Sequence, residues 1–125
     1  MYHLLVVAAG GAVGASMRHL LNLASLRLIG PTFPWGTLTI NIVGSFAMGV
    51  FIELLARRTG ASPELRLFVA TGVLGGFTTF SAFSLDVVVL WERGAHAAAA
   101  GYVAASVAGA VAALIAGMAI VRGFA

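Results

Sequence analysis

Four long apolar runs alternate with short polar segments along the chain. The runs extend over residues 4–28, 36–55, 65–91 and 97–121, and each is long enough to cross a bilayer as a helix, which takes about 20 residues. The segments between them hold prolines, charges and tryptophans of the kind found at membrane interfaces. The pattern predicts an all-α polytopic membrane protein, a single transmembrane domain over residues 1–125 with four transmembrane helices.

Composition supports this class. Hydrophobic residues make up 61% of the chain and charged residues 9%, and the mean hydropathy of +1.05 lies outside the soluble range. The net charge of +3 comes from arginines scattered over the connecting segments, so no nucleic-acid partner is expected. With no cysteine there is no disulfide and no thiolate chemistry. We expect a function within the bilayer, and not an enzyme.

The third run contains an interruption, TGVLGGFTTFSAFSLD, at residues 71–86. Gly75 and Gly76 can adopt backbone angles closed to other residues, and nearby hydroxyls can bond freed backbone groups: Thr78, Thr79 and Ser81. An unwound turn at membrane depth is tolerated only inside protein or beside a water-filled cavity. Its carbonyls can coordinate a cation and its N–H groups can attract an anion, so the break predicts an ion or substrate site.

Asn41 is an amide side chain near the middle of the second run. Helical spacing places it on one face with Thr37, Gly44, Ser45 and Met48. Such a residue is costly in a membrane unless it is bonded, and it usually faces the bundle interior. Its NH₂ group suits an anion, but it can equally join two helices, and the spacing does not separate these alternatives.

Phe80 and Phe83 follow the break and share a helical face. A phenyl ring is positive at its edge, so rings presented edge-on can stabilise an anion without trapping it. For two phenylalanines taken alone, however, core packing is the better interpretation.

Charged residues lie mostly near the ends of the runs. Glu53 and Arg57 are four apart in the order of a favourable helical pair and are interpreted as interfacial structure. Arg18 can snorkel to the interface or draw anions into a vestibule. Asp86 either lines a vestibule or bonds a neighbouring helix, and the sequence leaves both open.

Small residues recur at every fourth position on two runs. The first run carries Gly10 and Gly14, and the fourth carries an unbroken series: Gly101, Ala105, Gly109, Ala113 and Gly117. Such stripes let helix backbones approach closely, so each alone favours packing within the chain. Four thin helices make a poor pore wall, which favours an oligomer.

Three segments together resemble the Fluc/CrcB fluoride channel family. They are GGAVGASMRH at residues 10–19, GTLTINIVGSFAMG at 36–49 and GVLGGFTTFSAFS at 72–84. They fall in the order and on the runs that the family requires, and with the fourth run the resemblance covers nearly the whole chain.

The resemblance implies an antiparallel, dual-topology homodimer in a bacterial cytoplasmic membrane, with two fluoride pores and a central structural sodium ion. By motif position, main-chain carbonyls of Gly75 and Thr78 would bind sodium. The pore residues expected on this basis are Phe80 and Phe83 as rings, Asn41 as donor, Arg18 towards the vestibule, and the hydroxyls of Thr37, Thr79, Ser81, Tyr102 and Ser106. Ala82 and Ala110 depart from the family, where threonine and serine are common, so the polar track is expected to be shorter or wetter.

The function expected is passive, fluoride-selective export that lowers cytoplasmic fluoride. The alternative is a small four-helix, proton-coupled multidrug antiporter, which needs an ionisable residue deep in a span. The first run has no carboxylate and Glu53 lies near an end. A purely structural subunit would leave the interrupted third run unexplained.

Arginine counts bear on orientation without any family argument. One side of a four-span chain would carry Arg57, Arg58, Arg66 and Arg122, and the other would carry Arg27 and Arg93, with Arg18 as a possible third. Because topology follows the Lys/Arg bias of short loops, four against two or three is a weak bias. We therefore expect both orientations to insert.

Overall fold

The computed structural model describes residues 1–124, which form helices joined by short loops. The helices are α1 (Tyr2–Leu28), α2 (Trp35–Ala56), a third column described below, and α6 (His96–Gly123). Four helical stretches are long and apolar enough to span a membrane. Their ends lie within two residues of the predicted runs, so the all-α class with four spans is confirmed.

The third column consists of four consecutive pieces. A turn of α-helix, α3 (Pro63–Arg66), leads into a π-helix, η1 (Leu67–Leu74), and then a short α4 (Gly75–Phe77). After two extended residues the chain resumes as α5 (Phe80–Glu92). The predicted break in the third span is therefore present.

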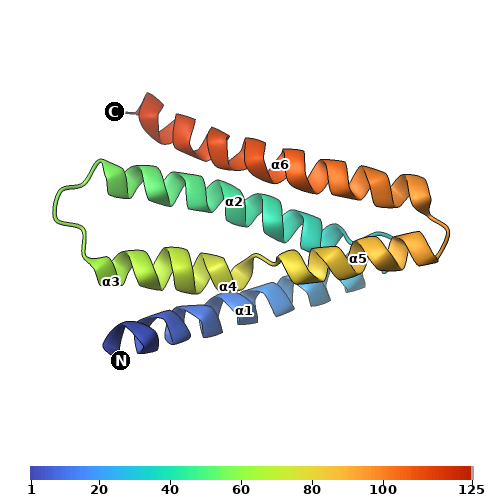
Figure 1. Cartoon of the computed structure of the whole chain (residues 1–125), viewed down its shortest axis with the longest axis horizontal. Coiled ribbons are helices and arrows are strands. Elements are labelled where there is room, and N and C mark those ends of the chain that lie inside the picture. The colour runs from blue at the N-terminus through green and yellow to red at the C-terminus, as the bar shows by residue number, and fades with distance from the viewer. Residues whose placement is uncertain (125) are drawn as a thin grey trace.

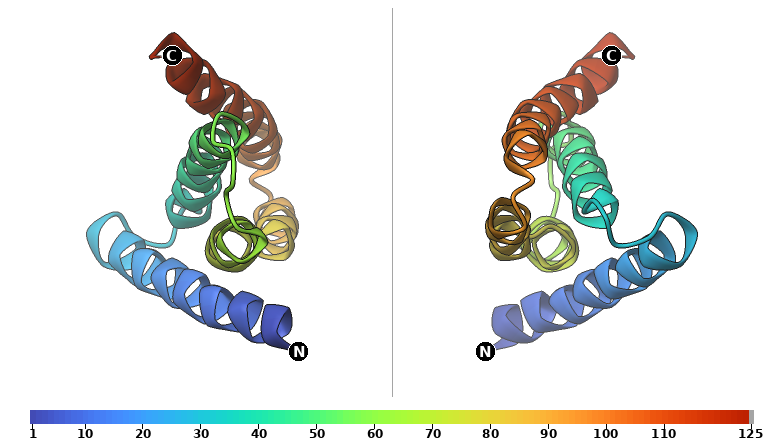
Figure 2. Two further views of the ribbon diagram at one scale, coloured as in Figure 1. Left: turned by 90° about the vertical axis from the view of Figure 1, so that its left-hand side faces the viewer. Right: turned by 90° about the vertical axis from the view of Figure 1, so that its right-hand side faces the viewer.

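The helices form two layers that diverge along the molecule. Helices α2 and α6 lie side by side, and α1 crosses the column of η1 and α4 (Figures 1 and 2). Both termini lie at the same end as the α2–α3 loop (Figure 1). The α5 end of the column packs against α6, so the break faces the interior of the subunit.

Glycines allow the closest helix contacts. A side chain at Gly14 on α1 would overlap the carbonyl oxygen of Val73, and one at Gly117 on α6 would overlap that of Phe46. These members of the two small-residue stripes therefore serve packing within the chain, which is how helices associate in lipid. Gly101, at the other end of the α6 stripe, faces open space.

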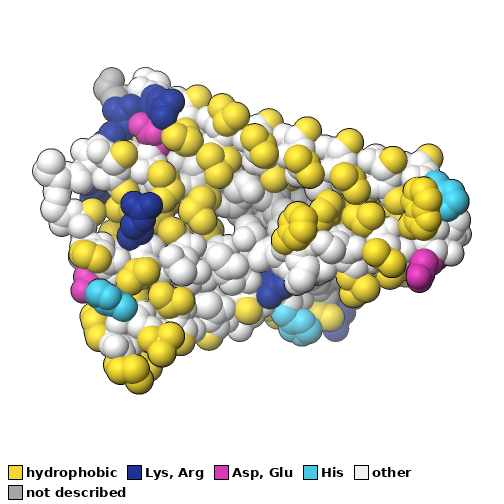
Figure 3. Space-filling view, in the orientation of Figure 1, with side chains coloured by type: hydrophobic (Ala, Val, Ile, Leu, Met, Phe, Trp, Pro, Cys, Tyr) yellow, Lys and Arg dark blue, Asp and Glu magenta, His cyan; other side chains and the backbone are white. Residues whose placement is uncertain are grey.

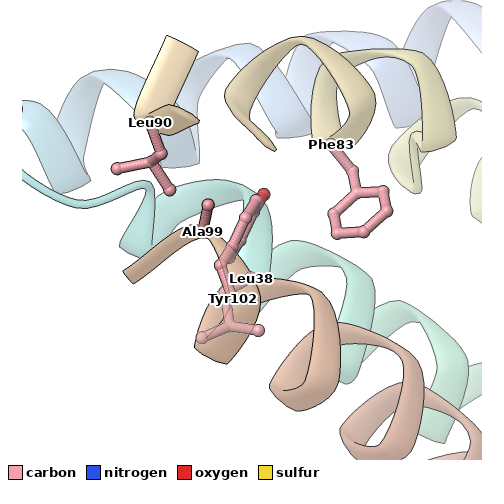
Figure 4. Packing of buried hydrophobic residues seen from close by; sticks show 5 residues of the cluster. All are labelled: Leu38, Phe83, Leu90, Ala99 and Tyr102. Atoms are coloured by element: carbon pink, nitrogen blue, oxygen red, sulfur yellow. The ribbon is translucent and has the colours of Figure 1, made fainter. Parts of the chain in front are cut away.

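The main core cluster fills the space between α2, α5 and α6. Its buried members are Leu38, Phe83, Leu90, Ala99 and Tyr102 (Figure 4). Tyr102 has no exposed surface at all. Apolar side chains also cover much of the outer surface, as expected for helices that face lipid (Figure 3).

The end that holds the termini carries a cluster of charges (Figure 3). Glu53 bonds Arg57 Nε on its own helix at 3.3 Å and Arg122 Nε on α6 at 3.1 Å. The predicted pairing of Glu53 with Arg57 is confirmed, and the bond to Arg122 joins the ends of two spans.

Candidate ion site

The break in the third span lies at Thr78 and Thr79, which have extended backbones with ψ of 157° and 123°. The expectation that Gly75 and Gly76 would unwind was wrong, because both are helical. Gly76 instead permits close packing on α1, since a Cβ there would lie 2.8 Å from the carbonyl oxygen of Gly11.

Asn41 on α2 holds the break open. Its Oδ1 accepts a hydrogen bond from Thr79 N at 2.8 Å, and its Nδ2 donates to Thr79 O at 2.9 Å. The side-chain amide thus takes the place of a neighbouring backbone for one residue. The helix-joining interpretation of Asn41 is confirmed. The second hydrogen on Nδ2 is the one that its predicted role as an anion donor requires.

Gly44 lies one turn beyond Asn41 and completes this contact. A Cβ at Gly44 would overlap the methyl group of Thr78 and approach the Phe77 ring at 3.2 Å. Helix α2 therefore presents an amide followed by a bare backbone to the break. The sequence placed both residues on one face but did not indicate the partner.

The bonds at the break release two particular carbonyl groups. In a continuous α-helix, Thr79 N would bond Gly75 O and Ala82 N would bond Thr78 O. Thr79 N bonds Asn41 instead, and Ala82 N bonds Thr79 Oγ1 at 3.2 Å as a helix N-cap. The oxygens of Gly75 and Thr78 are therefore free of their helical donors and are available to a hard cation.

Carboxylates and imidazoles do not offer a competing cation site in the described chain. No group of three or more His, Cys, Asp or Glu side chains among residues 1–124 could hold a metal ion. Any cation bound near the break would therefore rely on neutral oxygens.

A cavity of about 370 Å³ lies between the break, α2 and α6, and we call it the inner cavity. Five predicted pore residues line it: Asn41, Thr79, Phe80, Phe83 and Ser106. The Phe80 and Phe83 ring centroids are 5.4 Å apart. Ser106 Oγ is fully buried and has no hydrogen-bond partner within residues 1–124. An unpaired hydroxyl is costly away from water, so it marks a place where a further acceptor fits.

The outer cavity, about 320 Å³, lies between the end of α1, the α1–α2 loop and α5. Thr37 and Asp86 line it, and the Tyr102 hydroxyl donates to Asp86 Oδ2 at 2.9 Å. Asp86 thus bonds a neighbouring helix and also lines a cavity, so both open interpretations of this residue hold.

The remaining predicted pore residues lie apart from the inner cavity. Ser81 is exposed, with its hydroxyl 3.5 Å from Thr79 Oγ1. Arg18 is half-buried on α1 and lines neither cavity. Tyr102 is packed at 5.2 Å between ring centroids against Phe83 and separates Thr37 from Ser106. The predicted polar track is thus divided between two cavities.

Two residues near the outer cavity were missed in the sequence. Phe33 in the α1–α2 loop packs edge-on against Tyr102, and Arg93 Nη2 donates to Thr32 O at 2.6 Å. An aromatic residue within the proline-rich segment was the only local signal for the first. Nothing in the pattern connects Arg93 with a loop 61 positions away.

Comparisons with known proteins agree on one family. Residues 5–118 match the family model described as CrcB-like protein, Camphor Resistance (CrcB). The chain is 63% identical to the fluoride-specific ion channel FluC of Mesorhizobium japonicum and 61% identical to that of Chelativorans sp., over 98% of each chain in both cases. It is 55% identical over the full length of both chains to FluC of Rhizobium etli strain CIAT 652.

Proposed function

The chain belongs to the CrcB family, and from that premise we propose that it is a fluoride-selective ion channel, not an enzyme. It would let fluoride leave the cytoplasm passively as a multi-pass protein of the bacterial inner membrane. The observation that carries this proposal is the inner cavity, whose lining holds hydrogen-bond donors and aromatic rings but no charged residue.

Fluoride is small and strongly hydrated, so a pore must replace its water with donors and still release it. Ser106 Oγ has an uncommitted proton and Asn41 Nδ2 has a second one. The edges of Phe80 and Phe83 add a weak positive potential. Because no fixed positive charge lies in the cavity, the ion would be solvated without being trapped.

A second, inverted copy of the chain would complete this cavity. Phe80 lines it yet is 76% exposed in the single subunit, while Phe83 is 7% exposed. Gly75 is also exposed, so one of the two freed carbonyls faces outwards. We propose an antiparallel homodimer in which the partner covers these groups, consistent with the weak arginine bias.

Orientation can be tested with two reporters fused separately to the C-terminus, one active only in the cytoplasm and one active only outside it. Strong signal from both would support dual topology. Signal from one alone would mean that the chain inserts in a single orientation, which rules out an inverted copy of itself as partner.

The carbonyls of Gly75 and Thr78 support a structural sodium site at the dimer centre. Pairing two inverted breaks would bring the freed oxygens of both copies together, and a cation would offset the repulsion among their dipoles. Exchange of sodium for N-methyl-D-glucamine should then lower the melting temperature of the purified dimer. An unchanged melting temperature after exhaustive exchange would argue against a structural cation.

The antiporter alternative is not favoured by the contacts of the acidic residues. Glu53 is engaged by two arginines, and Asp86 accepts a hydrogen bond from Tyr102. The relatives described above also carry the name of a channel and not of a drug transporter.

Conduction can be tested in liposomes that hold purified protein and are loaded with equal concentrations of fluoride and chloride. Electrodes for the two ions report efflux from the same vesicles after dilution into a medium that lacks both. We expect rapid fluoride release and little chloride release. Equal release of the two ions would contradict a fluoride-selective channel.

A further inference from the structure

The α1–α2 loop, residues 29–34, inserts an aromatic ring into the core. The Phe33 and Tyr102 ring centroids are 5.4 Å apart at an interplanar angle of 83°, an edge-to-face contact. Tyr102 contacts Phe83 on α5, which in turn contacts Phe80. Four rings therefore form a continuous row from the loop to the break.

Tyr102 lies between the two cavities in this row. Phe33 lines the outer cavity and Phe83 lines the inner cavity, while the Tyr102 side chain is completely buried and lines neither. Its hydroxyl is held by Asp86, which lines the outer cavity. An ion moving from one cavity to the other would therefore meet the Tyr102 ring.

Arg93 fixes the loop that carries Phe33. The loop has no regular secondary structure, and Arg93 Nη2, just beyond the end of α5, donates to the carbonyl oxygen of Thr32 at 2.6 Å. Thr32 directly precedes Phe33, so this charge-assisted bond holds the backbone next to the ring. Arg93 forms no ion pair with the acidic side chains of residues 1–124.

We propose that Phe33 and Arg93 are specificity-determining residues, which keep the Tyr102 partition too narrow for anions larger than fluoride. The inference rests on the proposed function. Phe33 supports one side of the Tyr102 ring and Phe83 the other, so loss of Phe33 leaves a void into which the ring can move. Arg93 acts through the loop by positioning Phe33. Chloride, the larger ion, gains most from a wider passage.

The test measures the ratio of chloride to fluoride efflux from liposomes for Phe33→Ala and Arg93→Met. Size discrimination in a tight site changes by about tenfold or more per group removed, so we expect the ratio to rise about tenfold. Arg93→Lys keeps a donor for Thr32 O and should restore most of the selectivity. Arg27→Met is the matched control, because Arg27 is exposed at the end of α1 and has no printed contact to the loop. It removes the same charge and should leave the ratio unchanged.

A merely structural role would reduce both fluxes together and leave their ratio unchanged. If Phe33→Ala does not assemble, Phe33→Leu supplies the same comparison with most of the volume kept. An unchanged ratio in the assembled Phe33 variant and in Arg93→Met, with normal wild-type fluoride flux, would overturn the inference and leave the proposed function intact. Absence of wild-type fluoride flux would instead overturn the proposed function.

Trp35 reports on the loop independently of ion flux. Its ring centroid lies 4.6 Å from that of Phe33, and in a Trp91→Phe background it is the sole tryptophan. We expect acrylamide to quench Trp35 fluorescence more strongly in Arg93→Met than in Arg93→Lys or Arg27→Met. Equal quenching in all three would show that Arg93 does not hold the loop, and would overturn its positioning role.

Discussion

Replacement of Asn41 by Leu should disable the break as well as the pore. Leu has nearly the same size but can form neither bond with Thr79. One main-chain N–H and one C=O would be left without partners at membrane depth, where little water can replace them. Each unsatisfied buried group costs about 1–3 kcal/mol, so the two together cost about 2–6 kcal/mol.

This cost is large against a typical folding stability of about 5–15 kcal/mol. It corresponds to a fall in melting temperature on the order of 10 °C. The chain can relieve part of it if Thr79 N–H returns to Gly75 O, but that closes the break and withdraws the carbonyl proposed for sodium. Either outcome removes fluoride conduction.

The assay pairs the melting temperature in detergent with fluoride efflux from liposomes. Thr39→Ala is the control, because Thr39 is exposed on the same helix two residues earlier and forms no hydrogen bond with residues 1–124 in its side chain. We expect wild-type behaviour from it. Lost efflux with an unchanged melting temperature in Asn41→Leu would refute the reasoning, since Asn41 would then act only on the ion.

Three further substitutions test other contacts. Phe83→Ile keeps most of the buried volume but loses the ring, so fluoride efflux should fall about tenfold with the dimer intact; normal efflux would mean that the ring only packs. Glu53→Gln removes the charge that faces Arg122, so the melting temperature should fall while efflux per folded protein is kept, and an unchanged melting temperature would show that the pair adds no stability. Gly14→Val places a side chain against a carbonyl of the third column and should prevent assembly, whereas Gly101→Val should be tolerated; equal yields would contradict the packing of α1.

The spans were predictable from the sequence because bilayer thickness imposes a length of apolar chain on each of them. All four helical stretches end within two residues of the predicted runs. The two small-residue stripes predicted close packing, and Gly14 and Gly117 confirm it.

The position of the break was not predictable to the residue. Glycine signals where a backbone can bend, but Gly75 and Gly76 stay helical. The chain leaves the helix at Thr79, where a side chain 38 positions earlier takes the N–H. A local pattern contains no information on such a tertiary bond, although it does place Asn41 on an inward face.

The division of the polar track had the same cause. Thr37 and Ser106 belong to one expected track, yet the fully buried Tyr102 ring separates their cavities. The packing of Phe33 on that ring depends on the path of a loop, and apolar periodicity says nothing about loop paths.

Fluoride conduction is tested most directly by the reversal potential of the current through a planar bilayer that contains the protein. With a tenfold gradient of fluoride and an opposed tenfold gradient of chloride, a passive fluoride channel should reverse at about 59 mV with the sign set by fluoride. A superimposed pH gradient should leave that value unchanged. A reversal potential that follows chloride, or that shifts with the pH gradient, would contradict passive fluoride-selective conduction.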